Sequence, residues 1–153
     1  MTTPISDPNA DRRHWMSVLA RAPADAIETG LSSHAPLPVW TRVRGPEVGL
    51  AMVRGRAGGA GAPFNLGEMT VTRCTVRLDS GVAGHAYIAG RDDRRAELAA
   101  VADALLQDPV SGVILRNSLI PPLEAASAAA RRDGAEKAAA TKVDFFAMRT
   151  MRT

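Results

Sequence analysis

The sequence is poor in aromatic residues and almost free of cysteine. Phe, Trp and Tyr make up only 4% of the chain, so the core must be aliphatic and alanine-based, and such side chains bury little area each. Cys74 is the single cysteine, which excludes an intrachain disulfide and a cysteine-based metal cluster and fits a reducing cytoplasm. The sequence contains no run of about twenty apolar residues, which a membrane span would need, and the N-terminal MTTPISDPNADRRHW has no apolar signal segment. We therefore expect a soluble, cytoplasmic protein that is not exported and binds no metal.

Lysine is also scarce, although the chain is basic. Nineteen Lys and Arg residues against sixteen Asp and Glu give a formal net charge of +3, and Lys137 and Lys142 are the only lysines. Arginine binds phosphate, phosphonate or carboxylate through a planar fork, so the bias indicates anionic ligands or acidic partner surfaces. An arginine-rich codon usage in a high-GC genome is an alternative explanation for the same bias.

The residue pattern predicts an α+β fold in a single domain over residues 1–153, with flexible residues 1–8. We expect N-terminal helices, a small antiparallel β-sheet of about four strands, a covering helix and a long alanine-rich C-terminal helix. Trp15, Val18 and Leu19 share one face of the first helix, and a second short helix follows over 24–31. The four strands are expected at 39–44, 48–54, 70–78 and 82–89.

Alternation is clearest in the strand at 70–78. The even-numbered residues of this strand, which include Cys74, Val76 and Leu78, form a face that we expect to pack in the core. Arg73 and Arg77 belong to the opposite, polar face. Gly45-Pro46 and residues 79–81 are expected to be turns between neighbouring strands. The covering helix is expected to begin at Asp92 and Asp93 and to stop at Asp108-Pro109.

The C-terminal segment 122–150 is predicted to be a helical arm that docks on a partner. Its alanine-rich part has a thin apolar stripe, while its large apolar side chains gather near the end of the chain. We expect the partner interface to include these residues and the N-terminal tryptophan: Trp15, Val143, Phe145, Phe146 and Met148. The alternative is that this end folds back on the chain's own core.

A glycine-rich loop between 54 and 64 is flanked by arginines. Glycines there allow close approach of a ligand or another chain to the backbone. The candidate anion-facing residues are Arg54, Arg56, Gly58, Gly59, Arg73 and Arg77. The competing interpretation is that the strand arginines are solvated or paired with a nearby acid.

No catalytic signature is present in the sequence. The glycine loop has no lysine and leads to a strand, which does not match a phosphate-binding P-loop, and Gly59-Ala60-Gly61 is not followed by a helix as a dinucleotide-binding turn would be. The three histidines lack metal-ligand spacing. We therefore name no catalytic residue and expect no cofactor bound by this chain.

Three blocks of sequence resemble one family. They are RRHWMSVLARA at 12–22, GGAGAPFNLGEMTVTRCTVRL at 58–78 with HAYIAGRD at 85–92, and KVDFFAMR at 142–149. In this order they are similar to the PhnG subunit family of the bacterial carbon-phosphorus lyase core complex, and the resemblance spans residues 12–149.

The resemblance implies a subunit that assembles with PhnI-like, PhnH-like and PhnJ-like subunits in a two-fold hetero-oligomer, with ATP-binding-cassette-like PhnL or PhnK proteins as further partners. It implies a non-catalytic or co-catalytic role in the step that transfers the ribose triphosphate moiety of ATP to an alkylphosphonate, with release of adenine. In this account ATP is a substrate of the complex, and the subunit is inactive alone.

A small basic nucleic-acid-binding α+β module is the alternative function. That class uses base-stacking aromatics among basic residues on the sheet. Only Trp40 and Tyr87 lie on the predicted strands, so we expect nucleic acid not to be the partner.

Overall fold

The computed structural model describes residues 9–56 and 61–142. It contains five α-helices and three β-strands within these ranges. In chain order they are α1 (Ala10–Leu19), α2 (Ala24–Ser32), β1 (Trp40–Gly55), β2 (Phe64–Leu78), β3 (Ala83–Ala89), α3 (Asp93–Gln107), α4 (Ser111–Ser118) and α5 (Ile120–Ala140). The predicted α+β class is confirmed.

The strands form one antiparallel sheet in the order β1-β2-β3. The prediction of about four strands is corrected to three, because residues 39–44 and 48–54 belong to one strand. Gly45-Pro46 does not turn the chain but lies at an irregularity, where the register with β2 shifts between Arg42 and Glu47. Proline is tolerated there because β1 is an edge strand, whose outward N–H groups need no partner strand.

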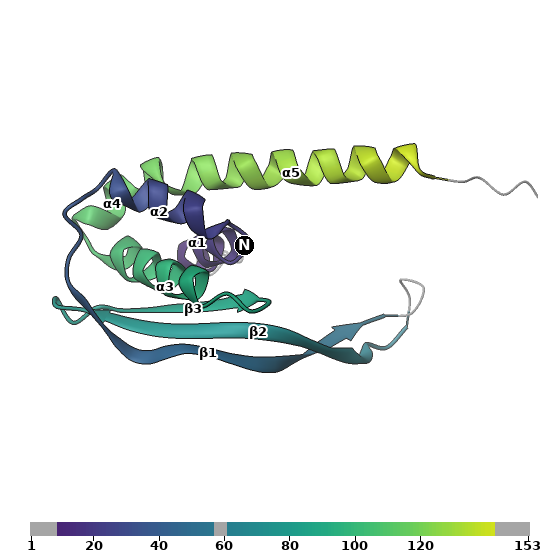
Figure 1. Cartoon of the computed structure of the whole chain (residues 1–153), viewed down its shortest axis with the longest axis horizontal. Helices are drawn as coiled ribbons and strands as arrows, with labels where there is room; N and C mark the ends of the chain where they lie inside the picture. The colour runs from purple at the N-terminus through teal and green to yellow at the C-terminus, as the bar shows by residue number, and fades with distance from the viewer. Residues whose placement is uncertain (1–8, 57–60, 143–153) are drawn as a thin grey trace, which may run out of the picture.

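One face of the sheet carries the helices and the core. Cys74, Val76 and Leu78 of β2 are buried on this face, as predicted from their alternation, while Arg73 and Arg77 are exposed on the other. Helix α3 packs directly on the sheet. On the side of α3 away from the sheet lie α1, α2, α4 and the start of α5 (Figure 1). The buried side chains are mostly Ala, Val, Leu and Ile, in keeping with the low aromatic content.

Gly84 explains how closely α3 approaches the sheet. A Cβ atom at Gly84 would lie 2.0 Å from the Ala100 carbonyl oxygen and 2.5 Å from the Ala104 amide nitrogen. These are backbone atoms of α3, so they cannot move aside without shifting the helix. Glycine at this position of β3 and alanines along α3 therefore set the distance between the two layers.

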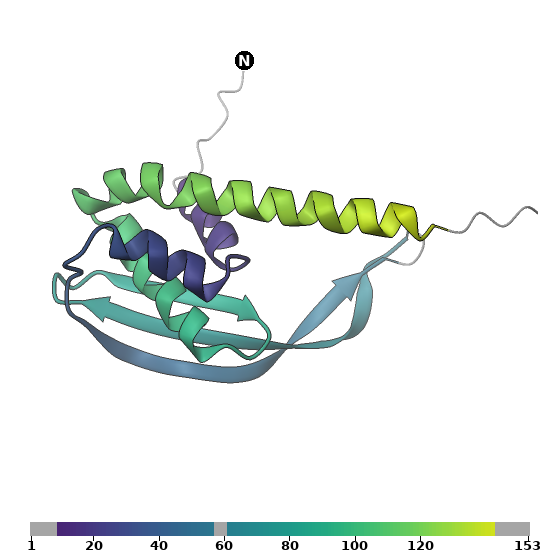
Figure 2. The ribbon, with the colours of Figure 1, turned by 45° about the horizontal axis from the view of Figure 1, so that its top comes forward.

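Two elements project from this body in the same direction. The first is the far part of the β1–β2 ribbon, residues 48–56 and 61–70, which we call the projecting hairpin. The second is the distal half of α5, which runs free of the other helices (Figures 1 and 2). Every residue of α5 from Ala129 onward is exposed, so its helical form depends on the propensity of alanine rather than on packing.

Helix α5 begins at Ile120, two residues before the predicted arm. Pro121 and Pro122 lie in its first turn, where the missing proline N–H would have no intrahelical acceptor. The helix ends at Ala140, so the remainder of the predicted 122–150 arm lies outside the described residues, as do residues 1–8. Within the described ranges, no helix combines the length and apolar character needed to cross a membrane.

Candidate functional surfaces

The predicted arginines do not converge on one site. Arg54 and Arg56 are exposed at the end of β1, on the projecting hairpin, and Arg54 lies opposite Asn65 in the sheet register. Arg73 is eight residues farther along β2, which is about 26 Å at ~3.3 Å per residue, and Arg77 is farther still. One triphosphate or phosphonate cannot reach both pairs.

Arg73 is already engaged by an acid. Its Nη2 lies 3.2 Å from Glu47 Oε2, and Arg44 Nε lies 2.9 Å from the same oxygen. The hydrogen bond from Arg44, with the charges of both arginines, lowers the pKa of Glu47. Arg73 is therefore paired with a nearby acid, which is the competing interpretation of the strand arginines. Arg77 makes no ion pair with any described residue.

Six of the predicted site residues lie outside the described residues. Gly58 and Gly59 of the loop belong to this group, and so do the apolar residues expected at the partner interface: Val143, Phe145, Phe146 and Met148. Their predicted roles stay predictions.

Trp15 lies in the core and not on an exposed interface, which corrects the prediction for this residue. Its ring is buried, with the Arg116 guanidinium carbon 5.0 Å from the ring centroid. The indole Nε1 donates to Asp103 Oδ1 at 2.8 Å. The apolar face of α1 therefore serves the chain's own fold.

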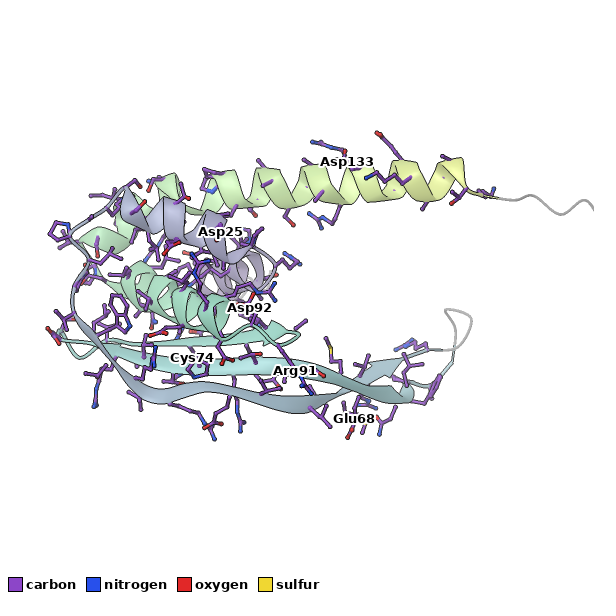
Figure 3. The ribbon with its side chains drawn as sticks, in the orientation of Figure 1. Asp25, Glu68, Cys74, Arg91, Asp92 and Asp133 are labelled. Carbon is purple, nitrogen blue, oxygen red and sulfur yellow. The ribbon has the colours of Figure 1, made fainter. Side chains whose placement is uncertain are left out.

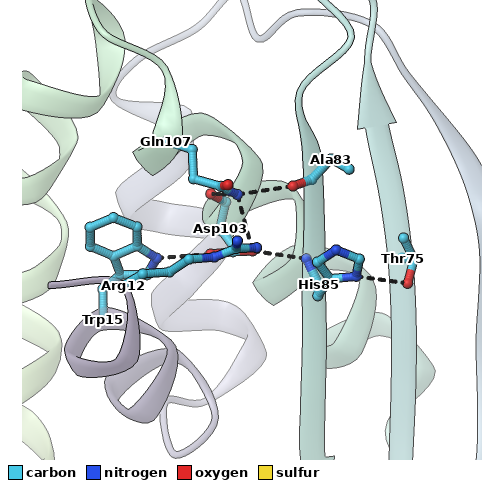
Figure 4. A network of polar contacts seen from close by, with 7 residues as sticks. All are labelled: Arg12, Trp15, Thr75, Ala83, His85, Asp103 and Gln107. Carbon is cyan, nitrogen blue, oxygen red and sulfur yellow. Dashed lines mark hydrogen bonds and ion pairs between the residues drawn. The ribbon is translucent and has the colours of Figure 1, made fainter. Parts of the chain in front are cut away.

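Asp103 is the centre of a polar network that the sequence pattern did not predict (Figure 4). Its side chain is 0% exposed. Arg12 donates to both carboxylate oxygens, at 3.2 and 2.8 Å. The His85 backbone N–H and Gln107 Nε2 donate at 2.9 and 3.3 Å. The sequence does hold one signal for this network, because Asp103 is a single acid among the apolar residues Val101, Ala102, Ala104 and Leu105. A charge in such a stretch is buried with the helix and therefore requires hydrogen-bond partners.

This network holds the molecule together and presents no reactive group. Arg12 and Trp15 come from α1, Asp103 and Gln107 from α3, and His85 from β3, so one carboxylate joins three elements. Five protein donors reach the two carboxylate oxygens, and the side chain is fully buried, so a substrate has no access to it. We assign the network to positioning α1 on the sheet.

A second acid, Glu97, ties the edge strand to α3. It accepts from Trp40 Nε1 at 3.2 Å and from Arg42 Nε and Nη2 at 2.9 and 2.7 Å. The hydrogen bond from Arg42 lowers the pKa of Glu97, and the Trp40 N–H and the Arg42 charge contribute. Trp40 therefore stabilises the fold. The exposed aromatic side chains of the described sheet are Tyr87 on β3, 54% exposed, and Phe64 at the start of β2, 46% exposed. Tyr87 lies opposite Arg73, nine residues along β2 from Phe64, so the two rings do not form a continuous base-stacking surface.

The cysteine and the three histidines do not gather in one site. Burial raises the pKa of the Cys74 thiol, which keeps it protonated and poorly nucleophilic. His14 pairs with Glu124, His34 with Ser118 and His85 with Thr75. Within the described ranges, no group of three or more His, Cys, Asp or Glu side chains could hold a metal ion.

A groove of about 410 Å³ lies between α2 and the α4–α5 junction. Its walls are mainly apolar, with Ala26, Leu119 and Leu123 among the lining residues. Its polar members are engaged within the chain, since Thr29 bonds the Asp25 carbonyl and Ser118 the Ile114 carbonyl. The groove does not gather groups that could catalyse a reaction.

The projecting hairpin is the least covered part of the sheet. Figure 3 shows side chains on both of its sides, with Glu68 labelled on it and Asp133 on α5. Leu50 is 64% and Leu66 59% exposed, and other large apolar side chains of the hairpin are exposed with them: Val48, Met52, Phe64 and Met69. Clusters of this kind mark interaction surfaces on soluble proteins.

Comparison with known proteins agrees with the resemblance seen in the sequence. The model of the family described as phosphonate metabolism protein PhnG matches residues 10–150. A protein of Rhizobium meliloti (strain 1021) is 46% identical over 139 residues, which is 91% of this chain and 88% of the relative. That relative is described as alpha-D-ribose 1-methylphosphonate 5-triphosphate synthase subunit PhnG. The nucleic-acid-binding alternative gains no support from these matches.

Proposed function

The chain belongs to the PhnG family of phosphonate metabolism proteins, and on that premise we propose that it is a subunit of an alpha-D-ribose 1-methylphosphonate 5-triphosphate synthase. The observation that carries the proposal is the 46% identity to the Rhizobium meliloti subunit over 91% of this chain. Identity at this level over nearly the whole length makes a shared role the simplest explanation.

The subunit contributes structure to the synthase rather than a complete active site. The surfaces described above support this part of the proposal, because the polar clusters around Asp103 and Glu97 are internal to the fold and the candidate arginines are spread along the sheet. The chemistry in which the ribose triphosphate moiety of ATP passes to an alkylphosphonate is carried by the assembled complex. ATP is a substrate of that complex and not a cofactor bound by this chain.

The partners of the subunit are the PhnI-like, PhnH-like and PhnJ-like proteins of a two-fold hetero-oligomer in the cytoplasm, with PhnL-like or PhnK-like proteins joining it. The relative's name supports assembly in a multisubunit enzyme. The two projections of this chain are suited to such assembly, since both extend exposed surface away from a body that is already closed.

Arg54 and Arg56 are the residues of this chain that would contribute to catalysis, by binding the anionic substrate. They have no carboxylate partner among the described residues, and an arginine fork matches the oxyanions of a triphosphate or phosphonate. Arg54→Ala with Arg56→Ala is expected to raise the KM for ATP or phosphonate in a complex that still assembles. Arg132→Ala, an exposed arginine on α5, is the matched control, and equal kinetics for both variants would remove the hairpin arginines from the active site.

Growth on methylphosphonate as the only phosphorus source tests the proposed function. A strain in which this gene is deleted is expected to fail on methylphosphonate, to grow normally on phosphate, and to recover when the gene is returned. Growth of the deletion strain on methylphosphonate at the wild-type rate would refute the proposal.

A further inference from the structure

The free edge of β2 is the feature of the projecting hairpin that the fold does not explain. Strand β3 pairs with β2 only from Val71 to Arg77, and the Thr70 carbonyl accepts from Gly90 N–H at 2.8 Å. From residue 64 to residue 69 the described chain provides no strand on that side of β2. Unpaired edges of this kind are templates for adding a strand from another chain.

The backbone groups of Glu68 face this open edge. Neighbouring residues of a strand direct their N–H and C=O groups to opposite edges, and the Thr70 carbonyl faces the β3 side. Glu68, two residues away, therefore directs its N–H and C=O to the same side, away from its cross-strand neighbour Met52.

Apolar side chains flank the edge. Leu50 and Met52 lie opposite Thr70 and Glu68, and their side chains share one face of the hairpin with them. The six exposed apolar side chains of the hairpin are about two-fifths to two-thirds exposed. A strand added at the edge of β2 would cover part of this surface while it completes the backbone hydrogen bonds.

The excess positive charge of the described chain lies on the two projections. Arg54 and Arg56 outnumber Glu68 on the projecting hairpin. Four basic residues over 131–142 outnumber Asp133 and Glu136 at the end of α5. The rest of the described chain carries equal numbers of basic and acidic side chains. The two projections thus offer a complementary field to an acidic partner.

We propose that the projecting hairpin accepts, at the β2 edge over residues 64–69, an extended segment of another synthase subunit that alternates apolar and acidic side chains. The inference rests on the proposed function, which supplies the assembly. The backbone at the edge gives affinity, Leu50 and Leu66 receive the apolar side chains, and the positive field of the two projections favours the acidic ones without a specific pair to Arg54 or Arg56.

A second copy of this chain fits the edge less well. The same hairpin and the same α5 would bring basic surface to basic surface, and like charges across an interface oppose association. The occupant is therefore a different protein of acidic character at this site.

The test uses the full chain co-expressed with the other synthase subunits of its genome, one of which carries the affinity tag. Leu50→Asp with Leu66→Asp is expected to reduce co-purification of this chain about tenfold or more, since an unpaired acid resists burial in an interface. Glu68→Pro, which removes the N–H at the open edge, is expected to weaken assembly as well. Val113→Asp with Ile114→Asp on α4, where both side chains are similarly exposed, is the matched control and is expected to assemble normally.

Amide hydrogen exchange of the wild-type protein gives a readout that needs no variant. Those backbone amides of residues 64–69 that face the open edge, such as the amide of Glu68, are expected to exchange about tenfold more slowly in the complex than in the isolated chain, because a new strand protects them. Circular dichroism of each isolated variant verifies that loss of assembly is not loss of folding.

Three outcomes would overturn the inference: unchanged exchange at 64–69 with normal assembly of the hairpin variants, an equal loss of assembly with the α4 control, or a hairpin-dependent homodimer by light scattering. In each case the growth experiment on methylphosphonate decides the proposed function separately. A deletion strain that fails to grow, together with hairpin variants that assemble, would retain the function and remove only the inference.

Discussion

At the scale of single residues, stability depends most on buried charges with several partners. Asp103→Ala removes the acceptor for Arg12, Trp15 and the His85 N–H. Breaking a buried pair on one side typically costs about 3–5 kcal/mol. Because Arg12 is partly exposed and can be rehydrated, we expect a loss of about 3 kcal/mol in the free energy of unfolding, measured with urea.

The control for this substitution is Asp133→Ala on α5, an exposed aspartate. Surface changes of this kind usually alter the free energy of unfolding by less than ~0.5 kcal/mol. Equal unfolding midpoints for the two variants would contradict the role assigned to the Asp103 network.

Glu97 gives the fold a pH dependence with a defined sign. Arg42 lowers the pKa of Glu97 below the ordinary value of 4.5, so the folded state binds its proton less readily than the unfolded state. The stabilisation is therefore complete above pH 4.5 and is lost as the pH falls through the lowered folded-state pKa. Wild type is expected to be more stable than Glu97→Gln at about pH 6, with the difference shrinking by about pH 3.

Urea unfolding at both pH values measures this effect. Glu136→Gln, an exposed change on α5, is expected to leave stability nearly unchanged at either pH. A constant difference between wild type and Glu97→Gln across this pH range would show that the Arg42–Glu97 contact does not act through charge.

At the scale of elements, the contact between β3 and α3 is the least tolerant. Gly84→Ala would place a Cβ against the α3 backbone at 2.0 Å, which forces the layers apart. Overpacking of cores typically costs about 1–3 kcal/mol, and the backbone clash places this variant at or above about 3 kcal/mol in the free energy of unfolding. Gly49→Ala, where no atom lies within 4 Å of the added Cβ, is expected to be tolerated, and similar stability of the two variants would contradict this account of the layer spacing.

The distal half of α5 is expected to be only locally stable. Gly134 lies in this exposed stretch, and no atom lies within 4 Å of the position that a Cβ would take there. Gly134→Ala should stabilise the local helix by about 1 kcal/mol, which corresponds to about fivefold slower amide exchange over the neighbouring residues. Global unfolding by urea should not change, and a shift of the global midpoint would show that α5 unfolds together with the body.

Local periodicity predicts most elements, and the errors occur where tertiary context decides. The alternation in β2 and the apolar face of α1 are predicted correctly because each has one buried side. Gly45-Pro46 is wrongly predicted as a turn, since sequence alone does not show that β1 is an edge strand that can hold a proline. Trp15 is wrongly placed at an interface because its partner, Asp103, is 88 residues away, and no local pattern links them.

At the scale of the whole molecule, a small closed body carries two exposed projections. The body buries Trp15 and balances its charges. The projecting hairpin and α5 carry the excess positive charge, and the hairpin carries exposed apolar side chains. This division suits a subunit whose fold is complete but whose function requires assembly.

Reconstitution of the synthase tests whether this chain is a required subunit. The other subunits, purified from a strain that lacks this gene, are mixed with ATP and methylphosphonate with and without the separately purified chain, and the products are followed by phosphorus NMR. Alpha-D-ribose 1-methylphosphonate 5-triphosphate is expected to form only when this chain is present. Product formation at the same rate in its absence would show that the chain is not a required subunit of the synthase.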